Sequence, residues 1–588
     1  MENLLNLVKH NVDKAIRDSL SKEVVEDALL QAEIEQTSNP TFGHYQCNNA
    51  FKLGKVLRKN PRQIAQSIID HLSKSSLNGD LMISSVEIAG PGFINISLDP
   101  GFLAKQIESL LIDPRLGVPV VTHPKKVIVE FSSPNVAKEL HVGHLRSTII
   151  GDCLARLFEF LGDNVLRLNH IGDWGTQFGM LIAYMQEYAS DVLEGKKEVD
   201  LSQLMQWYKE SKKKFDEDPV FKRKSQLEVV KLQGGDSSSL LAWQMICDIS
   251  RKAFLEIYDL LDIKTTERGE SFYNPYLPVI VADLEKKGLI TISDGAKCIF
   301  LEGFTNRENE PLPIIIQKSD GGYNYDTTDM AAIWHRVEKE KADRIIYCTD
   351  AGQSLHFQML FVAAEKAGYV NSKKVQLDHV TFGVVLGPDG KKFKTRSGET
   401  ERLIDLLLEA IAQAKKIMHE RLPDISMEEL DSLSKILGIN ALKYADLSGH
   451  RVKDYSFSYE RMLKFEGNTA AFLLYAYVRI QGIKRKVSKD VEALIGKESI
   501  ILEHPSEVEL ALHLRQFGET LEGISKDLLP NRLSEYLYTL AEKFHAFFRD
   551  CRVEGSERES SRLLLAEAAA RILKKGLEIL GLQVMNKM

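Results

Sequence analysis

Two histidines, His141 and His144, lie three residues apart in the segment SSPNVAKELHVGHLRST. This segment stands between a buried-strand pattern and an amphipathic-helix pattern, so both imidazoles can face one way from the first turn of a helix. The free amide N–H groups and the dipole at that end of a helix attract phosphate, and Gly143 lets a ligand approach the backbone closely. These residues predict a phosphate-binding site. Two alternatives stay open: histidines with purely structural hydrogen bonds, and a zinc site, for which no third ligand is evident.

A second candidate phosphate site is the Gly-containing segment FGVVLGPDGKKFKTRSGE, which carries Lys391, Lys392, Lys394 and Arg396. In phosphoryl transfer, negative charge spreads over the transferring and leaving oxygens, and cations beside those oxygens stabilise it. A cationic loop of this kind suits a nucleoside triphosphate. The alternative is an ordinary basic hairpin turn at PDGKK.

An acid and an aromatic ring, Asp329 and Tyr325, stand four residues apart in GGYNYDTTDMAA. If a helix begins near Tyr325, the two side chains share one face of it. A carboxylate on that face could accept the planar fork of donors of a guanidinium, with the ring as a wall beside it. The alternative is an ordinary acid on a helix surface.

The elements that must position these residues are a strand pattern at 127–131, the helix pattern after it and a second strand pattern in NVLRLNHIGD. Strand, helix and strand at this spacing predict a βαβ unit in a parallel sheet, which binds ligands at the carboxyl ends of its strands. Two more buried-strand patterns, PIIIQKS and DRIIYCTD, each lead towards a helix. We therefore expect an α/β fold with a doubly wound sheet, divided by a charged helical insertion at about 180–310.

The remaining segments predict further domains, as expected for 588 residues. Residues 1–112 indicate a small α+β unit, with helical stretches at 3–36 and 61–75 and a strand pattern, VEIAGPGFINISL, broken by Gly90-Pro91-Gly92. We expect the sheet domain at 120–400, a connecting helical region at 401–450 and an all-α domain at 451–588, where amphipathic runs follow one another.

Composition narrows the class of protein. The chain is 44% hydrophobic and 27% charged, which is typical of folded globular proteins. A net charge of −7 excludes a uniformly polycationic nucleic-acid binder, although the part from Arg451 onward has 22 Lys and Arg against 20 Asp and Glu. Six scattered cysteines without a C-x-x-C pair exclude the common Cys-rich zinc spacings and a disulfide scaffold. No apolar segment is typical of a signal peptide or a membrane span, so we expect a soluble cytoplasmic protein, with an organellar matrix or stroma as the alternative location.

The ordered set of motifs resembles a known family. SSPNVAKELHVGHLRST is similar to the HIGH signature of class I aminoacyl-tRNA synthetases, and in particular to that of the arginyl-tRNA synthetase family. The segments LNHIGDWGTQFG, TTDMAA and FEGNTAAFLLYAYVRI match that family too, so the resemblance extends over essentially the whole chain. It implies a Rossmann-like parallel-sheet catalytic domain with a helical insertion, a small N-terminal α+β domain that touches the tRNA elbow and an all-α anticodon-binding domain.

The resemblance also implies an activity. Arginyl-tRNA synthetases activate L-arginine with ATP to arginyl-adenylate and pyrophosphate, and then transfer arginine to the 3′ end of the cognate tRNA. By resemblance, activation requires bound tRNA(Arg), Mg²⁺ accompanies ATP, the protein supplies no metal site or structural zinc of its own, and the chain is a monomer without a membrane partner.

Roles for individual residues follow from the same resemblance. The catalytic residues would be His141, Gly143, His144, Lys138, Lys392, Lys394 and Arg396. Arginine would bind to Glu130, Ser133, Pro134, Asn135, His144, Tyr325, Asp329 and Gln353. ATP would bind to His141, His144, Phe382, Gly383, Val384 and Lys392.

The chain departs from the class at its second signature, KMSKS, where it has KFKTR and Thr395 takes the place of the second Lys. The resemblance to arginine enzymes implies that Lys138, just before the first signature, compensates for it. Which cation meets which phosphate stays open.

Contacts with tRNA are implied in two places: Phe93 and Asn95 in the N-terminal unit, and Asn468, Tyr475, Tyr477 and Arg479 in the C-terminal domain. Aromatic rings beside basic residues could stack on unpaired bases. The alternatives are a buried Phe in a strand, packed Tyr residues and a solvated helix face.

Two rival functions stay open. A glutamate, cysteine or lysine synthetase would need a different pocket. An acidic substrate requires basic groups in place of Asp329, and a cysteine enzyme requires zinc ligands. A non-catalytic tRNA-binding relative should have lost parts of the signatures, whereas this chain keeps them together.

Overall fold

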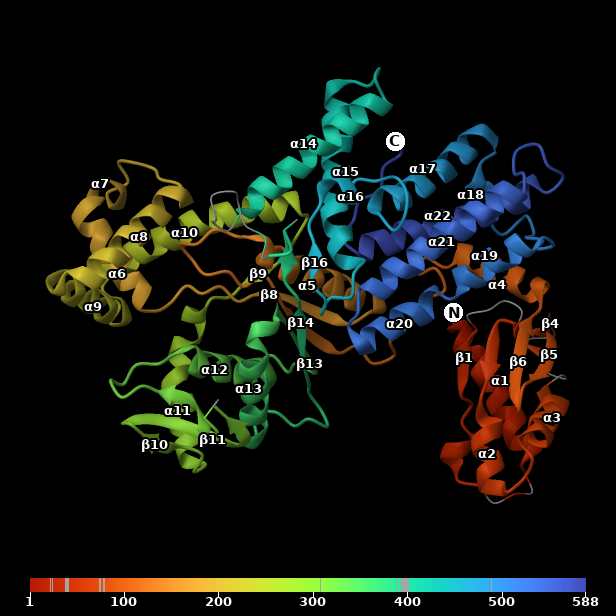
Figure 1. The fold of residues 1–588 in the computed structure, drawn as a ribbon, viewed down its shortest axis with the longest axis horizontal. Coiled ribbons are helices and arrows are strands. Elements are labelled where there is room, and N and C mark those ends of the chain that lie inside the picture. The colour runs from red at the N-terminus through yellow and green to blue at the C-terminus, as the bar shows by residue number, and fades with distance from the viewer. Residues whose placement is uncertain are drawn as a thin grey trace.

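The computed structural model describes the whole chain except residues 22, 24, 38–41, 73–75, 78–79, 307, 388, 392, 394–400 and 488. A central parallel sheet is joined on one side to an all-helical C-terminal bundle, against which the N-terminal unit lies, and on the other side to a helical insertion and a separate antiparallel sheet (Figure 1). None of the described helices is long and apolar enough to cross a lipid bilayer.

The N-terminal unit is an antiparallel sheet of order β1-β2-β6-β5 covered by helices. The predicted break at Gly90-Pro91-Gly92 is the turn of the β5–β6 hairpin. The helix expected over 3–36 ends sooner, because its apolar face stops at Leu20 and the chain then turns into a strand. The elements are α1 (Leu4–Ser19), η1 (Asp27–Leu30), β1 (Ile34–Gln36), β2 (Tyr45–Cys47), α2 (Asn49–Leu57), α3 (Pro61–Leu72), β3 (Ser76–Leu77), β4 (Asp80–Leu81), β5 (Ile83–Ala89), β6 (Phe93–Leu98) and α4 (Pro100–Ile112).

The central sheet is parallel throughout, with the order β14-β13-β7-β8-β9. Its strands are β7 (Lys126–Glu130), β8 (Asn164–Asn169), β9 (Thr266–Glu267), β13 (Arg344–Asp350) and β14 (Gln376–Phe382). The predicted βαβ unit is confirmed: α5 (Val142–Leu161) connects β7 to β8. The chain leaves β7 towards one edge of the sheet and leaves β13 towards the other. Ligands of open α/β sheets bind at such a reversal of strand order.

The two faces of this sheet belong to different cores. Val127 and Val129 pack in the core that contains α5 and the C-terminal helices, whereas Ile128 packs with α12 (Tyr325–Glu338) and α13 (Ser354–Lys366). Gly151 brings α5 close to the sheet, because a side chain there would overlap the ring of Phe131. The starts of α5 and α12 therefore approach the carboxyl edge of the sheet from opposite faces.

The insertion has a helical and a mixed part. The helices α6 (Thr176–Tyr188), α7 (Ser190–Leu193), α8 (Leu201–Glu217), α9 (Pro219–Gln233) and α10 (Ser237–Leu260) form a core of their own. After them come η3 (Glu270–Tyr276), α11 (Leu277–Lys286), β10 (Thr291–Ser293), β11 (Ala296–Thr305) and β12 (Pro311–Gln317). One expectation was wrong here: PIIIQKS forms β12 of an antiparallel sheet, order β10-β11-β12, and not a strand of the parallel sheet. A short apolar run indicates burial but not which strand it pairs with.

The C-terminal part is almost wholly helical, as predicted. The helices α14 (Leu403–Arg421) and α15 (Met427–Leu447) form a pair, and the short strands β15 (Val385–Leu386) and β16 (Tyr455–Ser456) link this region to the end of β14. The others are α16 (Tyr459–Met462), α17 (Ala470–Val487), α18 (Val491–Leu494), α19 (Pro505–Arg515), α20 (Phe517–Asp527), α21 (Asn531–Asp550) and α22 (Glu559–Ile579).

Candidate active site

A pocket of about 910 Å³ opens at the carboxyl edge of the parallel sheet, at the reversal between β7 and β13. The ends of β7, β13 and β14 and the starts of α5, α12 and α13 form its wall. Twelve residues singled out from the sequence line it: Glu130, Ser133, Asn135, His141, Gly143, His144, Tyr325, Asp329, Gln353, Phe382, Gly383 and Val384. Segments more than 200 residues apart in the chain thus meet in one cavity.

One side of the pocket, the imidazole side, consists of His141 and His144 at the start of α5. His141 is the N-cap: its Nδ1 accepts a hydrogen bond from the Gly143 amide at 3.0 Å, and the Nδ1 of His144 accepts one from the His141 amide at 3.1 Å. The two ring centroids are 4.1 Å apart. Because each Nδ1 is an acceptor, the ring proton of each neutral imidazole lies on Nε2, which leaves a donor for a ligand.

Burial keeps both rings neutral. It lowers the pKa of His141, and burial together with the neighbouring His141 and Lys138 lowers the pKa of His144 to about 3. The imidazole side therefore offers uncharged N–H donors at the positive end of a helix.

The loop between β7 and α5 has strained backbone. Ser132 and Ser133 have φ of 68° and 47°, in the left-handed region. The Ser132 hydroxyl lies 2.7 Å from that of Tyr258, and the Ser133 amide donates to Asn169 at 2.9 Å, so this conformation is held in place. Within the described part of the chain, the buried Ser133 hydroxyl has no hydrogen-bond partner although it lines the pocket. Strain and an unpaired hydroxyl together indicate a ligand-binding loop.

The opposite side, the acidic side, consists of Glu270, Tyr325, Asp329 and His356. The helix α12 begins at Tyr325, as the sequence predicts, so Tyr325 and Asp329 share a face. His356 donates from Nε2 to Asp329 at 2.7 Å, and its Nδ1 is 3.3 Å from Asp326. Although burial lowers the pKa of His356, its hydrogen bonds to both carboxylates outweigh this and raise the pKa to about 9. An imidazolium thus stands beside Asp329.

Besides Asp329, the carboxylates of Glu270 and Glu130 line the pocket. Glu270, at the start of η3, has its pKa raised to about 8 by burial and by the negative charges of Asp329 and Asp173. Glu130 is 6% exposed and forms an ion pair of 2.5 Å with the buried Arg336. Glu270 has no ion-pair partner among the described residues, and a cation bound beside it would favour its ionised form.

Arg146, one turn along α5, ties the imidazole side to the segment after β14. Its guanidinium is buried, forms an ion pair of 2.9 Å with Asp446, and donates to the carbonyls of Gly383 at 2.7 Å and Arg451 at 3.2 Å. These bonds fix residues 382–384 beside the start of α5.

The comparisons with known proteins agree with this architecture. The model "tRNA synthetases class I (R), catalytic domain" matches residues 106–459, the model "Arginyl tRNA synthetase N terminal domain" matches 7–98, and the model "DALR anticodon binding domain" matches 473–588. A protein of Protochlamydia amoebophila named arginine–tRNA ligase is 60% identical over the whole of both chains. The chain belongs to the arginyl-tRNA synthetase family. An arginine–tRNA ligase of Nostoc sp. is 52% identical over 94% of both chains, and the crystal structure of the arginyl-tRNA synthetase of Plasmodium falciparum has a TM-score of 0.85 at 35% identity, covering both chains in full.

Some residues singled out from the sequence lie outside the pocket of this synthetase. Pro134 is buried behind the wall, where its carbonyl accepts the amide of Gly172, and Lys138 is exposed and acts on His144 only through its charge. Lys392, Lys394 and Arg396 lie outside the described residues.

The residues proposed to contact tRNA differ in their exposure to solvent. Tyr475 is 36% exposed, and the Arg479 guanidinium lies over its ring at 5.4 Å. Asn468 is exposed, and Phe93 is half-buried with its ring 4.7 Å from that of Phe51. Asn95 and Tyr477 are only 7% and 8% exposed. Because these two belong to the core, we remove them from the candidate tRNA surface.

Sequence reasoning missed His356, Glu270 and Arg146. His356 stands three residues after Gln353, a helical spacing that could have drawn attention to it. Arg146 follows the second histidine by two residues, within the signature itself. Glu270 had no local signal, because it is a lone acid after a long insertion.

Proposed function

We propose that this pocket activates L-arginine with ATP and passes the arginine to the 3′ end of tRNA. The observation that carries the proposal is the position of Asp329, on a wall facing the helix start that bears His141 and His144. One cavity thereby offers a carboxylate for a guanidinium and donors for a phosphate. Membership of the arginyl-tRNA synthetase family supports the same activity.

The acidic side would bind the side chain of arginine. Asp329 would accept the guanidinium fork, Glu270 would supply a second carboxylate and the Tyr325 ring would form a wall. Citrulline carries no charge and lysine carries a single point charge, so each leaves an acceptor without its donor. A buried unpaired acceptor discriminates strongly, which makes a separate editing site unnecessary.

The α-amino and carboxylate groups would lie at the β7–α5 loop. The unpaired hydroxyl of Ser133 and the amide of Asn135 are available there, with Gln353 across the cavity and Glu130 behind. This leaves the substrate carboxylate pointing towards the imidazole side.

The first chemical step would be in-line attack by that carboxylate on the α-phosphorus of ATP. A bond forms between a carboxylate oxygen and the α-phosphorus, the bond to the β-phosphate oxygen breaks, and pyrophosphate leaves. The nucleophile is already an anion at neutral pH, so no general base is needed. Neutral Nε2–H groups of His141 and His144 would stabilise the charge on the transferring phosphate.

The remaining ATP contacts would come from the neighbouring segments. Phe382, Gly383 and Val384, held by Arg146, would bind the adenosine part, and Lys138 with Lys392, Lys394 and Arg396 would act on the phosphates. Mg²⁺ would be held mainly by the phosphates of ATP, because the described residues contain no group of three or more side chains able to hold a metal ion.

The tRNA would lie along the C-terminal bundle, where the exposed Tyr475 and the half-buried Arg479 beside it can stack on a base, with Asn468 nearby and Phe93 on the N-terminal unit. We further propose that activation requires bound tRNA, and that the chain acts as a monomer in the cytoplasm.

An ATP–pyrophosphate exchange assay with each of the twenty amino acids, with and without tRNA, tests the proposal. We expect exchange with arginine alone, and only when tRNA is present. Exchange with lysine or glutamate in place of arginine would contradict the substrate, and absence of exchange under all conditions would favour a non-catalytic tRNA-binding role. Exchange with arginine in the absence of tRNA would contradict only the tRNA requirement.

A further inference from the structure

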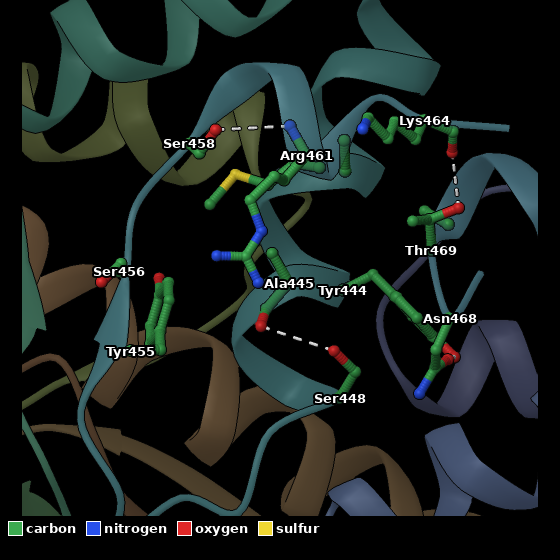
Figure 2. Close-up of a pocket in the computed structure, with 13 residues that line it drawn as sticks. Tyr444, Ala445, Ser448, Tyr455, Ser456, Ser458, Arg461, Lys464, Asn468 and Thr469 are labelled. Atoms are coloured by element: carbon green, nitrogen blue, oxygen red, sulfur yellow. Dashed lines mark hydrogen bonds between the residues drawn. The ribbon is translucent and has the colours of Figure 1, made fainter. Parts of the chain in front are cut away.

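A second cavity, of about 360 Å³, lies between α15, the segment around β16 and α16, and the start of α17 (Figure 2). Its residues play no part in the chemistry proposed above, except that Asn468 belongs to the candidate tRNA surface. Thirteen residues line it, among them Tyr444, Ser458, Arg461, Lys464, Asn468 and Thr469.

The charged side chains that line the cavity are all cationic. The lining contains two cations, Arg461 and Lys464, together with six hydroxyls and one amide, and these thirteen residues include no carboxylate. Hydroxyl and amide groups can donate to an anion, whereas a cation would find no charged acceptor here. The cavity therefore suits an anionic group.

Its strongest donors are free to bind. Figure 2 shows the Arg461 guanidinium extending from α16 into the cavity, towards the side formed by Ala445. No hydrogen bond or ion pair connects that guanidinium to any other residue that the structure describes. Lys464 is 48% exposed, and its ion pair with Glu460 is long, at 3.9 Å. A guanidinium without a partner and a weakly paired ammonium, both beside hydroxyls, can recognise a phosphate.

The neutral side chains are held in position before any ligand arrives. The buried Tyr444 hydroxyl donates to Oδ1 of Asn468 at 2.5 Å, which leaves the Nδ2 protons of Asn468 available. The Thr469 hydroxyl donates to the carbonyl of Lys464 at 2.6 Å, and Ser458 caps α16 by accepting the Arg461 amide at 3.3 Å. The Asn468 amide and the Ser458 hydroxyl keep protons that these bonds do not use, and because they are already oriented, less entropy is lost when an anion binds.

We propose that this cavity, the phosphate pocket, binds a backbone phosphate of the tRNA. A small free anion could also supply the phosphate, but Arg461 and Lys464 are both exposed residues, so a long polyanion can reach both. From Asn468 the chain enters α17, which carries Tyr475 and Arg479, so the pocket continues the surface assigned to tRNA. The inference rests on the proposed function only in its choice of tRNA as the partner. Backbone contacts of this kind fix the position of a nucleic acid without reading its sequence.

The test is tRNA affinity as a function of salt, measured on the full chain. Arg461→Gln and Lys464→Gln each remove one cation from the pocket. Arg223→Gln on α9 and Lys435→Gln on α15 are matched controls, because both side chains are exposed and neither lines the pocket. The affinity of each variant for unfractionated tRNA is measured at a series of salt concentrations. Binding of inorganic phosphate is measured in parallel by equilibrium dialysis.

We expect each pocket variant to weaken tRNA binding about tenfold at low salt and to reduce the slope of log affinity against log salt by about one. At saturating tRNA, the Michaelis constants for arginine and ATP should be unchanged. Slopes equal to those of the control variants would overturn the proposal. Unchanged tRNA binding together with loss of inorganic phosphate binding in Arg461→Gln would overturn tRNA as the source. Because binding is measured without turnover, a failure of arginine activation in the wild type would count against the proposed function and not against this pocket.

Discussion

The two sides of the main pocket hold their histidines in opposite charge states. On the acidic side, Asp329 and the neighbouring Asp326 both contact the His356 ring, and these contacts raise the pKa of His356 to about 9, so the ring is an imidazolium. On the imidazole side, burial keeps His141 and His144 uncharged, and the backbone amides of the helix start fix their tautomer. The same residue type is thus a cation on α13 and a neutral donor on α5.

The difference follows from the hydrogen-bond partners of each ring. A carboxylate stabilises the protonated ring, whereas a backbone N–H requires an unprotonated nitrogen. A charged acceptor suits a substrate whose guanidinium is permanently cationic. Neutral donors suit the reacting phosphate, whose negative charge changes during the reaction. Because they are uncharged, they do not attract the substrate carboxylate more strongly than they stabilise the transition state.

The largest effect should come from the imidazole side. His144→Gln keeps an acceptor at the third position of the helix, so the capping box can persist, but it removes the imidazole Nε2–H. We expect the rate of pyrophosphate exchange at saturating substrates to fall about 100-fold to 1000-fold, because a donor to the reacting phosphate is lost. An unchanged melting temperature is the control for folding. A variant with the wild-type rate would show that His144 is only structural.

On the acidic side, Asp329→Asn removes one negative charge while nearly keeping the shape. We expect the Michaelis constant for arginine to rise about 100-fold, with that for ATP little changed, since loss of one partner of a desolvated charge pair costs about 2–5 kcal/mol. Steady-state exchange kinetics separate the two constants. Equal saturation by arginine in variant and wild type would remove Asp329 from the substrate site.

The His356 imidazolium should make stability depend on pH. Its pKa of about 9 exceeds the ordinary value of 6.5, so its stabilising effect is complete below pH 6.5 and is lost as the pH rises from 6.5 to 9. We expect the difference in free energy of unfolding between the wild type and His356→Gln to shrink by about 2 kcal/mol over that range. Denaturant melts at several pH values measure it, and a constant difference would mean that His356 is neutral in the folded protein.

The smallest effect should come from Glu270, whose pKa is raised to about 8. A guanidinium binds the ionised carboxylate, so arginine should bind more tightly as the pH rises, by roughly tenfold between pH 7 and 8.5. Glu270→Gln should remove this dependence. If the variant kept the slope of the wild type, another group would be responsible for it.

The fold was predictable wherever a pattern is local. The unit of β7, α5 and β8 and the helices of the C-terminal bundle have periodic apolar residues, and both were confirmed. β12 was misassigned because its apolar run fits either sheet, and partner choice depends on long-range contacts that periodicity does not contain. The end of α1 was missed because the charged sequence after it is compatible with a surface helix.

The site was predictable where its residues stand in short motifs. His141, His144, Tyr325 and Asp329 belong to such motifs, and the structure brings them into one pocket. Glu270 reaches that pocket only because the helical insertion returns the chain to the sheet edge. Burial, charge state and ring tautomer depend on neighbours from other segments, so the protonation of His356 could not be read from its own surroundings in the sequence.

The most direct test of the whole account is competition between arginine and citrulline, which share their shape but not their charge. Measured on the wild type with tRNA present, citrulline should inhibit arginine-dependent exchange with an inhibition constant at least about 100-fold above the Michaelis constant for arginine. Comparable values for the two would show that the acidic side of the pocket does not select its substrate by charge.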